Sequence, residues 1–260
     1  MAVIDAHAHI YPNKIASRAV DAVGDFYLID MFGEGTVEHL LSAQQHAPIT
    51  HFIVHSVATT PGSVESINNF IAEQCRQHPE FIGFMAMHQD YPEPEKEIER
   101  AIGLGLKGMK LHPDTQHVNM DDPRLMNVYE MIEGRLPIVI HTGDYRYDYS
   151  HPRRLMNVLK TFPDLVVDAA HFGCWSRYEV ATTSCITPTT CSWTRRAPSS
   201  SWGSAARWSW RACGAPTASC SARTTPCGAL RRNTTSSSPP ASRRTSWRTC
   251  CGTTPSVSPA

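Results

Sequence analysis

Residues 136–143 read Leu-Pro-Ile-Val-Ile-His-Thr-Gly, a short apolar run that ends in a histidine followed by turn residues. A run of this length, rich in β-branched side chains, predicts a buried strand over Leu136–Ile140. Similar runs occur elsewhere in the first 180 residues. They are Val3–Ala6, His51–Val57, Phe81–Met87, Leu106–Leu111 and Leu165–Ala169. Residues 1–180 therefore predict six strands.

Amphipathic helices are predicted between these strands. Apolar residues recur at i, i+3, i+4 and i+7, the spacing of one helix face. Two such series are Val64, Ile67, Phe70, Ile71 and Leu125, Val128, Tyr129, Ile132. Asp122-Pro123 is a typical helix start, an N-cap followed by proline in the first turn. Strands that alternate with helices predict a parallel sheet.

The composition changes abruptly near residue 180. The chain of 260 residues has 24 Lys and Arg against 24 Asp and Glu. Residues 1–180 hold all 24 acidic residues but only 14 basic ones, a net charge of −10. Residues 181–260 hold no Asp, Glu, Lys, His, Phe or Tyr, but ten Arg, seven of the nine Cys and 31 Ser or Thr. The two segments therefore need separate interpretations.

Three interpretations of residues 181–260 are open. A basic, Ser/Thr/Pro-rich tail is typical of a disordered segment that binds nucleic acid. Seven cysteines suggest a metal knuckle or a disulfide scaffold, although no CxxC pair and no histidine accompany them. The third interpretation, which explains the whole composition, is translation in the wrong frame after a one-base change between about Ser176 and Thr183.

The hypothesis of a wrong reading frame is supported by regrouping the bases of the codons that could encode residues 181–260. With TCN serine and CGN arginine codons, regrouping the bases of Ser219–Gly228 one position earlier permits Val-Leu-Phe-Gly-Thr-Asp-Tyr-Pro-Met-Trp. Residues 189–194 similarly permit Asp-Asn-Val-Phe-Met-Asp. These hidden strands near residues 190–194 and 218–222 continue the spacing of the first six. As written, residues 181–260 are expected to be an irregular tail in place of strands seven and eight.

Eight βα units in about 260 residues are the size of a (β/α)₈ TIM barrel. We therefore predict an α/β fold of this class, with only strands one to six encoded in frame, in residues 1–180. A doubly wound sheet is the alternative. It is disfavoured because no Gly-rich phosphate loop follows the first strand.

Histidines gather at the predicted strand ends, where the active sites of such barrels lie. In Asp5-Ala6-His7-Ala8-His9, strand alternation places His7 and His9 on one face, so both could bind one divalent metal. His88, His112, His141 and His171 follow four other strands. His141 is a candidate metal ligand and His171 a candidate for metal or catalytic duty, while each could instead be a satisfied structural histidine.

Lys110 and His112 are predicted to share an inward face in Gly108-Met109-Lys110-Leu111-His112-Pro113. Lys110 could hold a substrate carboxylate, bridge two metals when carbamylated, or form a structural salt bridge. Arg146 and Tyr145, just beyond His141, are candidate substrate contacts, with a solvated loop as the alternative.

Four motifs together resemble the amidohydrolase superfamily, in its amidohydrolase-related, decarboxylase-like branch. They are His7-Ala8-His9, Gly108–Pro113, Ile140-His141-Thr142-Gly143 and His171-Phe172-Gly173. The resemblance covers about residues 1–180. It implies that His7, His9 and His141 bind one divalent metal, often zinc, with a second ion left open, and that His171 helps to activate water or polarise substrate. The family's eighth-strand aspartate has no counterpart; the regrouped codons supply one at Thr224.

The resemblance implies a metal-dependent hydrolase that opens an amide or lactone in a small, carboxylate-bearing substrate. Bound metal would lower the pKa of water towards about 7. Non-oxidative decarboxylation is the alternative within the same branch. Because the carboxylate ligand and two strands are missing, the chain as written is expected to lack activity. A non-enzymatic metal or nucleic-acid binder that uses the basic tail is the alternative from another class.

Charge and hydropathy indicate no nucleic-acid or membrane partner for the whole chain. The net charge is zero, and no apolar run approaches the roughly 18–20 residues of a membrane helix. Asp5 and His7 interrupt any signal-peptide core, which predicts a cytoplasmic protein. The expected partner is a small-molecule substrate, and homo-oligomerisation stays open.

Overall fold

The computed structural model describes residues 3–45, 47–173 and 175–176. Within them six strands form one parallel sheet in the order of the chain. The strands are β1 (Ile4–His9), β2 (His51–His55), β3 (Phe81–Ala86), β4 (Gly108–Leu111), β5 (Ile138–Ile140) and β6 (Val167–Ala169). All six predicted strands are confirmed, although β1 runs three residues beyond the predicted end at Ala6.

Helices connect successive strands, as the apolar periodicity predicts. They are α1 (Asn13–Tyr27), α2 (Val37–Ser42), α3 (Val64–Gln77), α4 (Pro94–Gly103), α5 (Pro113–Gln116), α6 (Pro123–Ile132) and α7 (Pro152–Thr161), with short 3₁₀ turns η1 (Ala43–Gln45), η2 (Pro61–Ser63) and η3 (His171–Gly173). The predicted cap of α6 is confirmed, because the Asp122 carboxylate accepts a hydrogen bond from the Arg124 backbone N–H.

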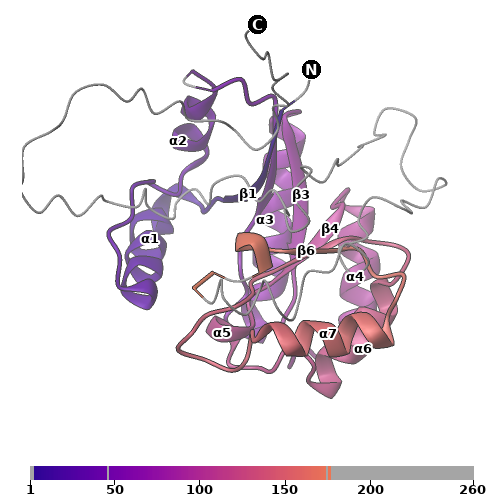
Figure 1. Ribbon diagram of the computed structural model, residues 1–260. Helices are drawn as coiled ribbons and strands as arrows, with labels where there is room; N and C mark the ends of the chain where they lie inside the picture. Colours follow the sequence, from indigo (N-terminus) through magenta and orange to yellow (C-terminus); the bar gives the residue numbers. More distant parts are fainter. Residues whose placement is uncertain (1–2, 46, 174, 177–260) are drawn as a thin grey trace, which may run out of the picture.

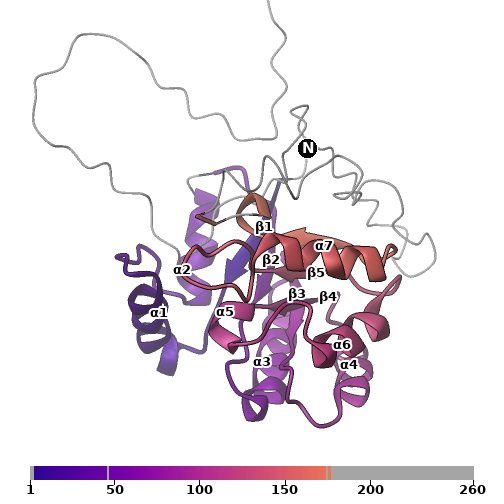
Figure 2. The same ribbon diagram turned by 60° about the horizontal axis from the view of Figure 1, so that its bottom comes forward.

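The sheet is curled and has two different apolar faces. Its inner face carries a small cluster of Ala6, Ile53, Phe84, Val139 and Ala170. The larger core lies between the strands and the helices, where side chains such as Phe52 and Met85 share a cluster with residues of α3, α4, α6 and α7. Figures 1 and 2 show α3, α4 and α6 along one side of the strands, with α1 and α2 beyond β1. This arrangement is a partial TIM barrel.

An irregularity in β1 determines which of its residues face the interior. Asp5 pairs with Phe52 of β2, but Ala8 pairs with Val54, so β1 advances three residues while β2 advances two. The extra residue is a β-bulge. Ala6 belongs to the inner cluster and Ala8 to the outer core. The bulge therefore lets His7 follow Ala6 on the inner side, where His9 also lies.

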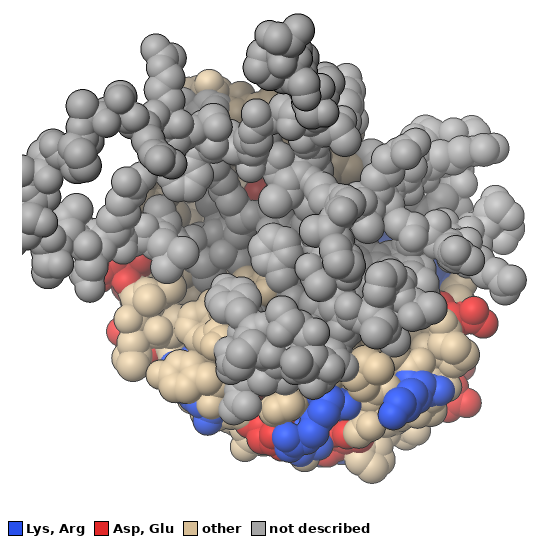
Figure 3. Space-filling model, viewed as in Figure 1, with Lys and Arg blue, Asp and Glu red and all other residues tan. Residues whose placement is uncertain are grey.

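Charges on the described surface are mixed in sign. Figure 3 shows Lys and Arg next to Asp and Glu along the lower edge of the molecule. Ion pairs among the described residues include Arg124 with Asp90 and Asp122, and Arg154 with Asp121 and Asp148. Among the described helices, none has the length and hydrophobicity needed to cross a bilayer.

The predictions for residues 181–260 lie outside the described residues. They comprise the boundary near residue 180, the irregular tail, the two hidden strands and the aspartate at Thr224. The observed architecture accordingly bears on the first six strands alone.

Candidate functional site

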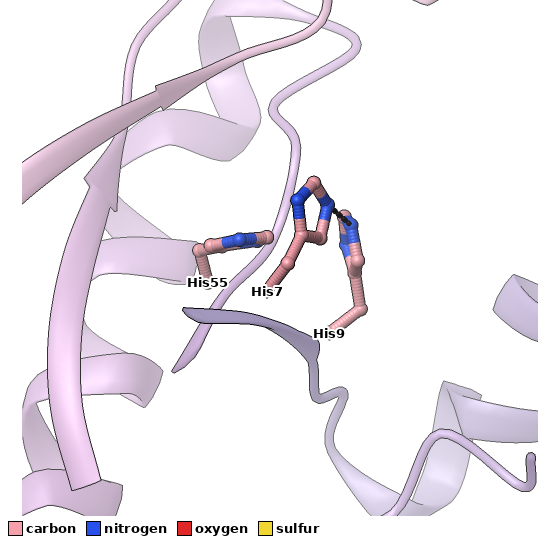
Figure 4. Close-up of side chains that lie close together, drawn as sticks. All are labelled: His7, His9 and His55. Carbon is pink, nitrogen blue, oxygen red and sulfur yellow. Dashed lines mark hydrogen bonds between the residues drawn. The ribbon is translucent and has the colours of Figure 1, made fainter. Parts of the chain in front are cut away.

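Three histidines from two adjacent strands meet at the inner side of the sheet. His7 and His9 come from β1, and their Nε2 atoms lie 3.2 Å apart. His55, the last residue of β2, packs edge-on against both, with ring centroids 4.7 Å from His7 and 4.5 Å from His9. Figure 4 shows the His55 ring directed towards His7. One nitrogen from each of the three rings lies within 4.8 Å of the others.

These imidazoles are neutral; His7 and His55 are buried, and His9 is partly buried. His7 is 1% exposed and His55 0%. Burial lowers the pKa of all three well below 6.5, and the positive charge of Lys110 lowers it further. Within the described part of the chain, Nδ1 of His7, Nδ1 of His9 and both ring nitrogens of His55 have no hydrogen-bond partner. Neutral imidazoles with free lone pairs are the form that binds a metal, so these three residues fit a divalent cation.

Lys110 is buried beside this histidine group. It lies on β4, is 1% exposed, and its Nζ is 3.2 Å from Nε2 of His7. Asp168 on β6 lies close enough to Lys110 for the ammonium charge to lower the pKa of its carboxyl group. Burial raises the pKa of Asp168 to about 7, although Lys110 acts in the opposite direction. The interior therefore holds a cation among imidazoles, close to a carboxyl group whose pKa is raised by burial.

A second group forms around the ends of β4 and β5. The rings of His112 and His141 are stacked, 4.0 Å apart at 5°. The Tyr27 hydroxyl at the end of α1 lies 2.6 Å from Nε2 of His112 and 3.3 Å from Nδ1 of His141. Oδ2 of Asp114 lies 3.5 Å from Nε2 of His141. Burial raises the pKa of Asp114 to about 7. His112, Asp114 and His141 are a second set with the spacing of metal ligands.

His171 lies between the two groups. Its ring centroid is 5.4 Å from that of His7 and 4.9 Å from that of His141. Burial lowers its pKa to about 3, and its backbone has the left-handed φ of 60°. A non-glycine residue rarely adopts this conformation, which is strained and is frequent at functional sites.

The predicted metal ligands His7, His9 and His141 thus lie in two different groups of side chains. His7 and His9 share the first group, whereas His141 contacts Tyr27, His112 and Asp114, and His171 connects the two. His88 serves a different purpose, since its Nδ1 accepts a hydrogen bond from the Asp90 backbone N–H.

Arg146 has the predicted position near His141 but is already paired. Its guanidinium donates two hydrogen bonds to the fully buried Asp144 carboxylate and a third to the Phe26 carbonyl. It also lies over the rings of Phe26 and Tyr147, 4.7 and 5.2 Å from their centroids. Arg146 therefore fastens the loop after β5 to the end of α1, next to Tyr27. Its contact with substrate remains a prediction.

Buried amide side chains fix the loops that carry the site. Gln116 of α5 donates hydrogen bonds to the carbonyls of Ala58 and Met87, and its own carbonyl accepts the His112 backbone N–H. Asn68 of α3 binds both the N–H and the carbonyl of Ala86 at the end of β3. These bonds connect the segments that follow β2, β3 and β4, so the histidines sit on rigid supports.

Sequence reasoning missed three residues of the site. His55 lies inside the predicted strand His51–Val57, and its position near that strand's end was the available signal. Asp114 comes directly after the Gly108–Pro113 motif, two residues beyond His112. Tyr27 had no signal, because α1 brings it across the sheet from 85 positions away in the sequence.

Comparison with known proteins agrees with this architecture. The sequence profile of the amidohydrolase family matches residues 4–199, whereas no curated protein matches the chain in sequence. A structure named as an amidohydrolase from Staphylococcus aureus superposes with a TM-score of 0.51 at 15% identity, covering 71% of this chain and 72% of that one.

Two further structures superpose less closely. A 5-carboxyvanillate decarboxylase from Novosphingobium aromaticivorans, in complex with manganese and 4-hydroxy-3-methoxy-5-nitrobenzoic acid, has a TM-score of 0.49 at 15% identity, covering 70% of this chain and 68% of that one. A protein named as a 2-pyrone-4,6-dicarboxylic acid hydrolase from Pseudomonas putida has a TM-score of 0.44 at 16% identity, covering 66% and 57%. Because the family profile matches residues 4–199, most of the chain, the protein belongs to the amidohydrolase family.

Proposed function

We propose that this chain carries the site of a metal-dependent hydrolase that cleaves an amide or lactone in a small, carboxylate-bearing molecule. The observation that supports this most strongly is the buried group of His7, His9 and His55 beside Lys110. Chemistry of this kind needs an electrophile or activated water next to a group that holds the substrate in place.

His7 and His9 would hold the ion. Two nitrogens bound to one zinc ion at about 2.0–2.1 Å, with a tetrahedral angle between them, lie about 3.3–3.4 Å apart. The Nε2 atoms of His7 and His9 are 3.2 Å apart, so they need almost no rearrangement. A divalent ion held here would supply Lewis acidity towards a carbonyl and lower the pKa of water.

Lys110 and His171 would act on the substrate. The Lys110 ammonium is a buried cation within reach of the histidine group and would orient a substrate carboxylate. His171 is neutral because burial lowers its pKa to about 3. A neutral imidazole can donate a hydrogen bond from its N–H group, and His171 would do so to the charge that develops on the reacting oxygen.

The chain as written is expected to bind metal weakly and to turn over negligibly, because its sequence supplies no eighth-strand aspartate. The test therefore uses two proteins, the chain as written and the chain with the reading frame restored after about Ser176. Metal content is measured after dialysis against zinc, and hydrolysis is measured on a panel of carboxylated amides and lactones, with carbon dioxide release recorded in parallel.

The expected result is one zinc ion per restored chain and hydrolysis that stops on chelation. His7→Ala and His9→Ala should abolish both, while His51→Ala, at the opposite end of β2, should leave both unchanged. Carbon dioxide release without hydrolysis would replace the proposal with decarboxylation. Stoichiometric metal after loss of both His7 and His9 would refute the site.

A further inference from the structure

His55 is a buried histidine whose ring makes no hydrogen bond within the described residues. It is 0% exposed, and neither Nδ1 nor Nε2 has a partner. A buried polar group without a partner is costly, and a fold normally avoids that cost by bonding the group or by replacing it with an apolar side chain. Its β2 neighbour Val54 packs in the outer core, whereas the His55 ring lies on the other face of the sheet, beside His7 and His9.

The neighbours of His55 indicate that its ring nitrogens could bind a metal ion. The ring ends next to the two imidazoles of β1, at centroid distances of 4.7 and 4.5 Å. His7 and His9 also have unpartnered Nδ1 atoms. The Nε2 atoms of His7 and His9 lie 3.2 Å from each other, and Nε2 of His7 also lies 3.2 Å from Nζ of Lys110, whereas both nitrogens of His55 lack a partner among the described residues. Three imidazoles that converge in this way are a suitable set of metal ligands.

From this convergence we infer that His55 is a third imidazole ligand of the divalent ion held by His7 and His9. The inference rests on the proposed function, since it adds a ligand to the same site. The present separation requires a small adjustment. The three donor atoms lie within 4.8 Å of one another, whereas two nitrogens bound to one tetrahedral zinc ion lie about 3.3–3.4 Å apart. Binding of the ion would draw the three nitrogens together through rotation of the imidazoles about their side-chain bonds.

The assignment has a geometric reason in the sheet. His55 is the direct pairing partner of His9 in the parallel β1–β2 ladder. Paired residues of adjacent parallel strands project from the same face, and the bulge in β1 brings His7 to that face as well. The pairing of β1 with β2 therefore places three candidate ligands side by side on one face of the sheet.

The experiment measures cobalt and zinc affinity of the full chain by competition with a chromogenic chelator, without any activity assay. His55→Phe keeps a buried ring of similar size, so the metal-free fold should be retained, as melting followed by circular dichroism checks. His51→Phe, at the other end of β2, is the matched control. His9→Ala tests whether metal binds at the proposed site at all, independently of His55. His55→Cys replaces the imidazole by a thiolate ligand, with His51→Cys as its control.

We expect His55→Phe to weaken metal binding by more than the about 10- to 100-fold that loss of an outer partner of a ligand causes, with an unchanged or higher melting temperature without metal. The cobalt complex of His55→Cys should show a thiolate-to-cobalt absorption band in the near ultraviolet that exceeds any band given by the nine native cysteines in wild type and in the His51→Cys control.

Wild-type affinity and cobalt spectra in both His55 variants, together with loss of binding in His9→Ala, would overturn the role of His55 and leave the proposed function intact. Wild-type affinity in His9→Ala as well, or no binding by the unmodified chain, would overturn both.

Discussion

Replacement of Lys110 by methionine should tighten metal binding, because it removes a positive charge beside a ligand. The Nζ atom of Lys110 is 3.2 Å from Nε2 of His7. An ion about 2.1 Å from that nitrogen would lie no more than about 5.3 Å from the ammonium. At an effective dielectric constant of about 20, charges of +1 and +2 at this separation repel by about 6 kcal/mol.

Only part of this repulsion energy should appear as a gain in metal affinity when Lys110 is replaced. The ammonium sits on a flexible four-carbon stem and can swing away from the ion, and the nearby Asp168 offsets some of its charge. We therefore expect Lys110→Met to tighten binding by about 1.4–4 kcal/mol, or roughly 10- to 1000-fold. Methionine retains an unbranched apolar stem, so the packing of β4 changes little.

The assay is competition with a chromogenic chelator at fixed pH, with zinc and with cobalt. Lys107→Met is the matched control, because Lys107 precedes the same strand and is exposed. The salt dependence should be small, since buried charges are poorly screened. Unchanged affinity would show that the ammonium does not face the ion. Weaker binding would show that Lys110 takes part in holding metal, as a carbamylated lysine does, and would refute the electrostatic reasoning.

Three further predictions concern stability, pH and the gene. Gln116→Ala removes hydrogen bonds to Ala58, Met87 and His112 and should lower the free energy of unfolding by about 3 kcal/mol in urea titrations, at about 1 kcal/mol per bond; a loss below about 1 kcal/mol, or one equalled by the exposed Gln77→Ala, would contradict it. Burial raises the pKa of Asp168 from 3.8 to about 7, so its ionisation opposes folding, and its contribution to stability is present below about pH 4 and lost as pH rises through 7; the stability difference between Asp168→Asn and wild type should grow over this interval, and a constant difference would exclude it. Sequencing the coding DNA around codons 176–183 should show a one-base change that reopens the other frame, and early stop codons in that frame would end the hypothesis.

The sequence alone determined the order and type of the elements. Apolar periodicity is a local property, so the strand at Leu136–Ile140 and the helix capped by Asp122 were readable without tertiary information. The motif around His7 and His9 was readable for the same reason, because alternation along one strand fixes which residues share a face. The predicted end of β1, at Ala6, was wrong. The prediction stopped there because the polar His7 ends the apolar run, but the strand continues to His9, and both histidines lie on the inner side of the sheet.

Only the tertiary structure decided which histidines meet. Strand pairing places His55 beside His9, and no pattern within β2 announces that contact. His141 instead stacks on His112 and approaches Asp114, because the curl of the sheet sets the distance between β1 and β5. Arg146 is directed to Asp144 rather than to open solvent by the path of its loop. Such contacts depend on register, curvature and side-chain rotation, which are fixed by the packing of residues far apart in the chain.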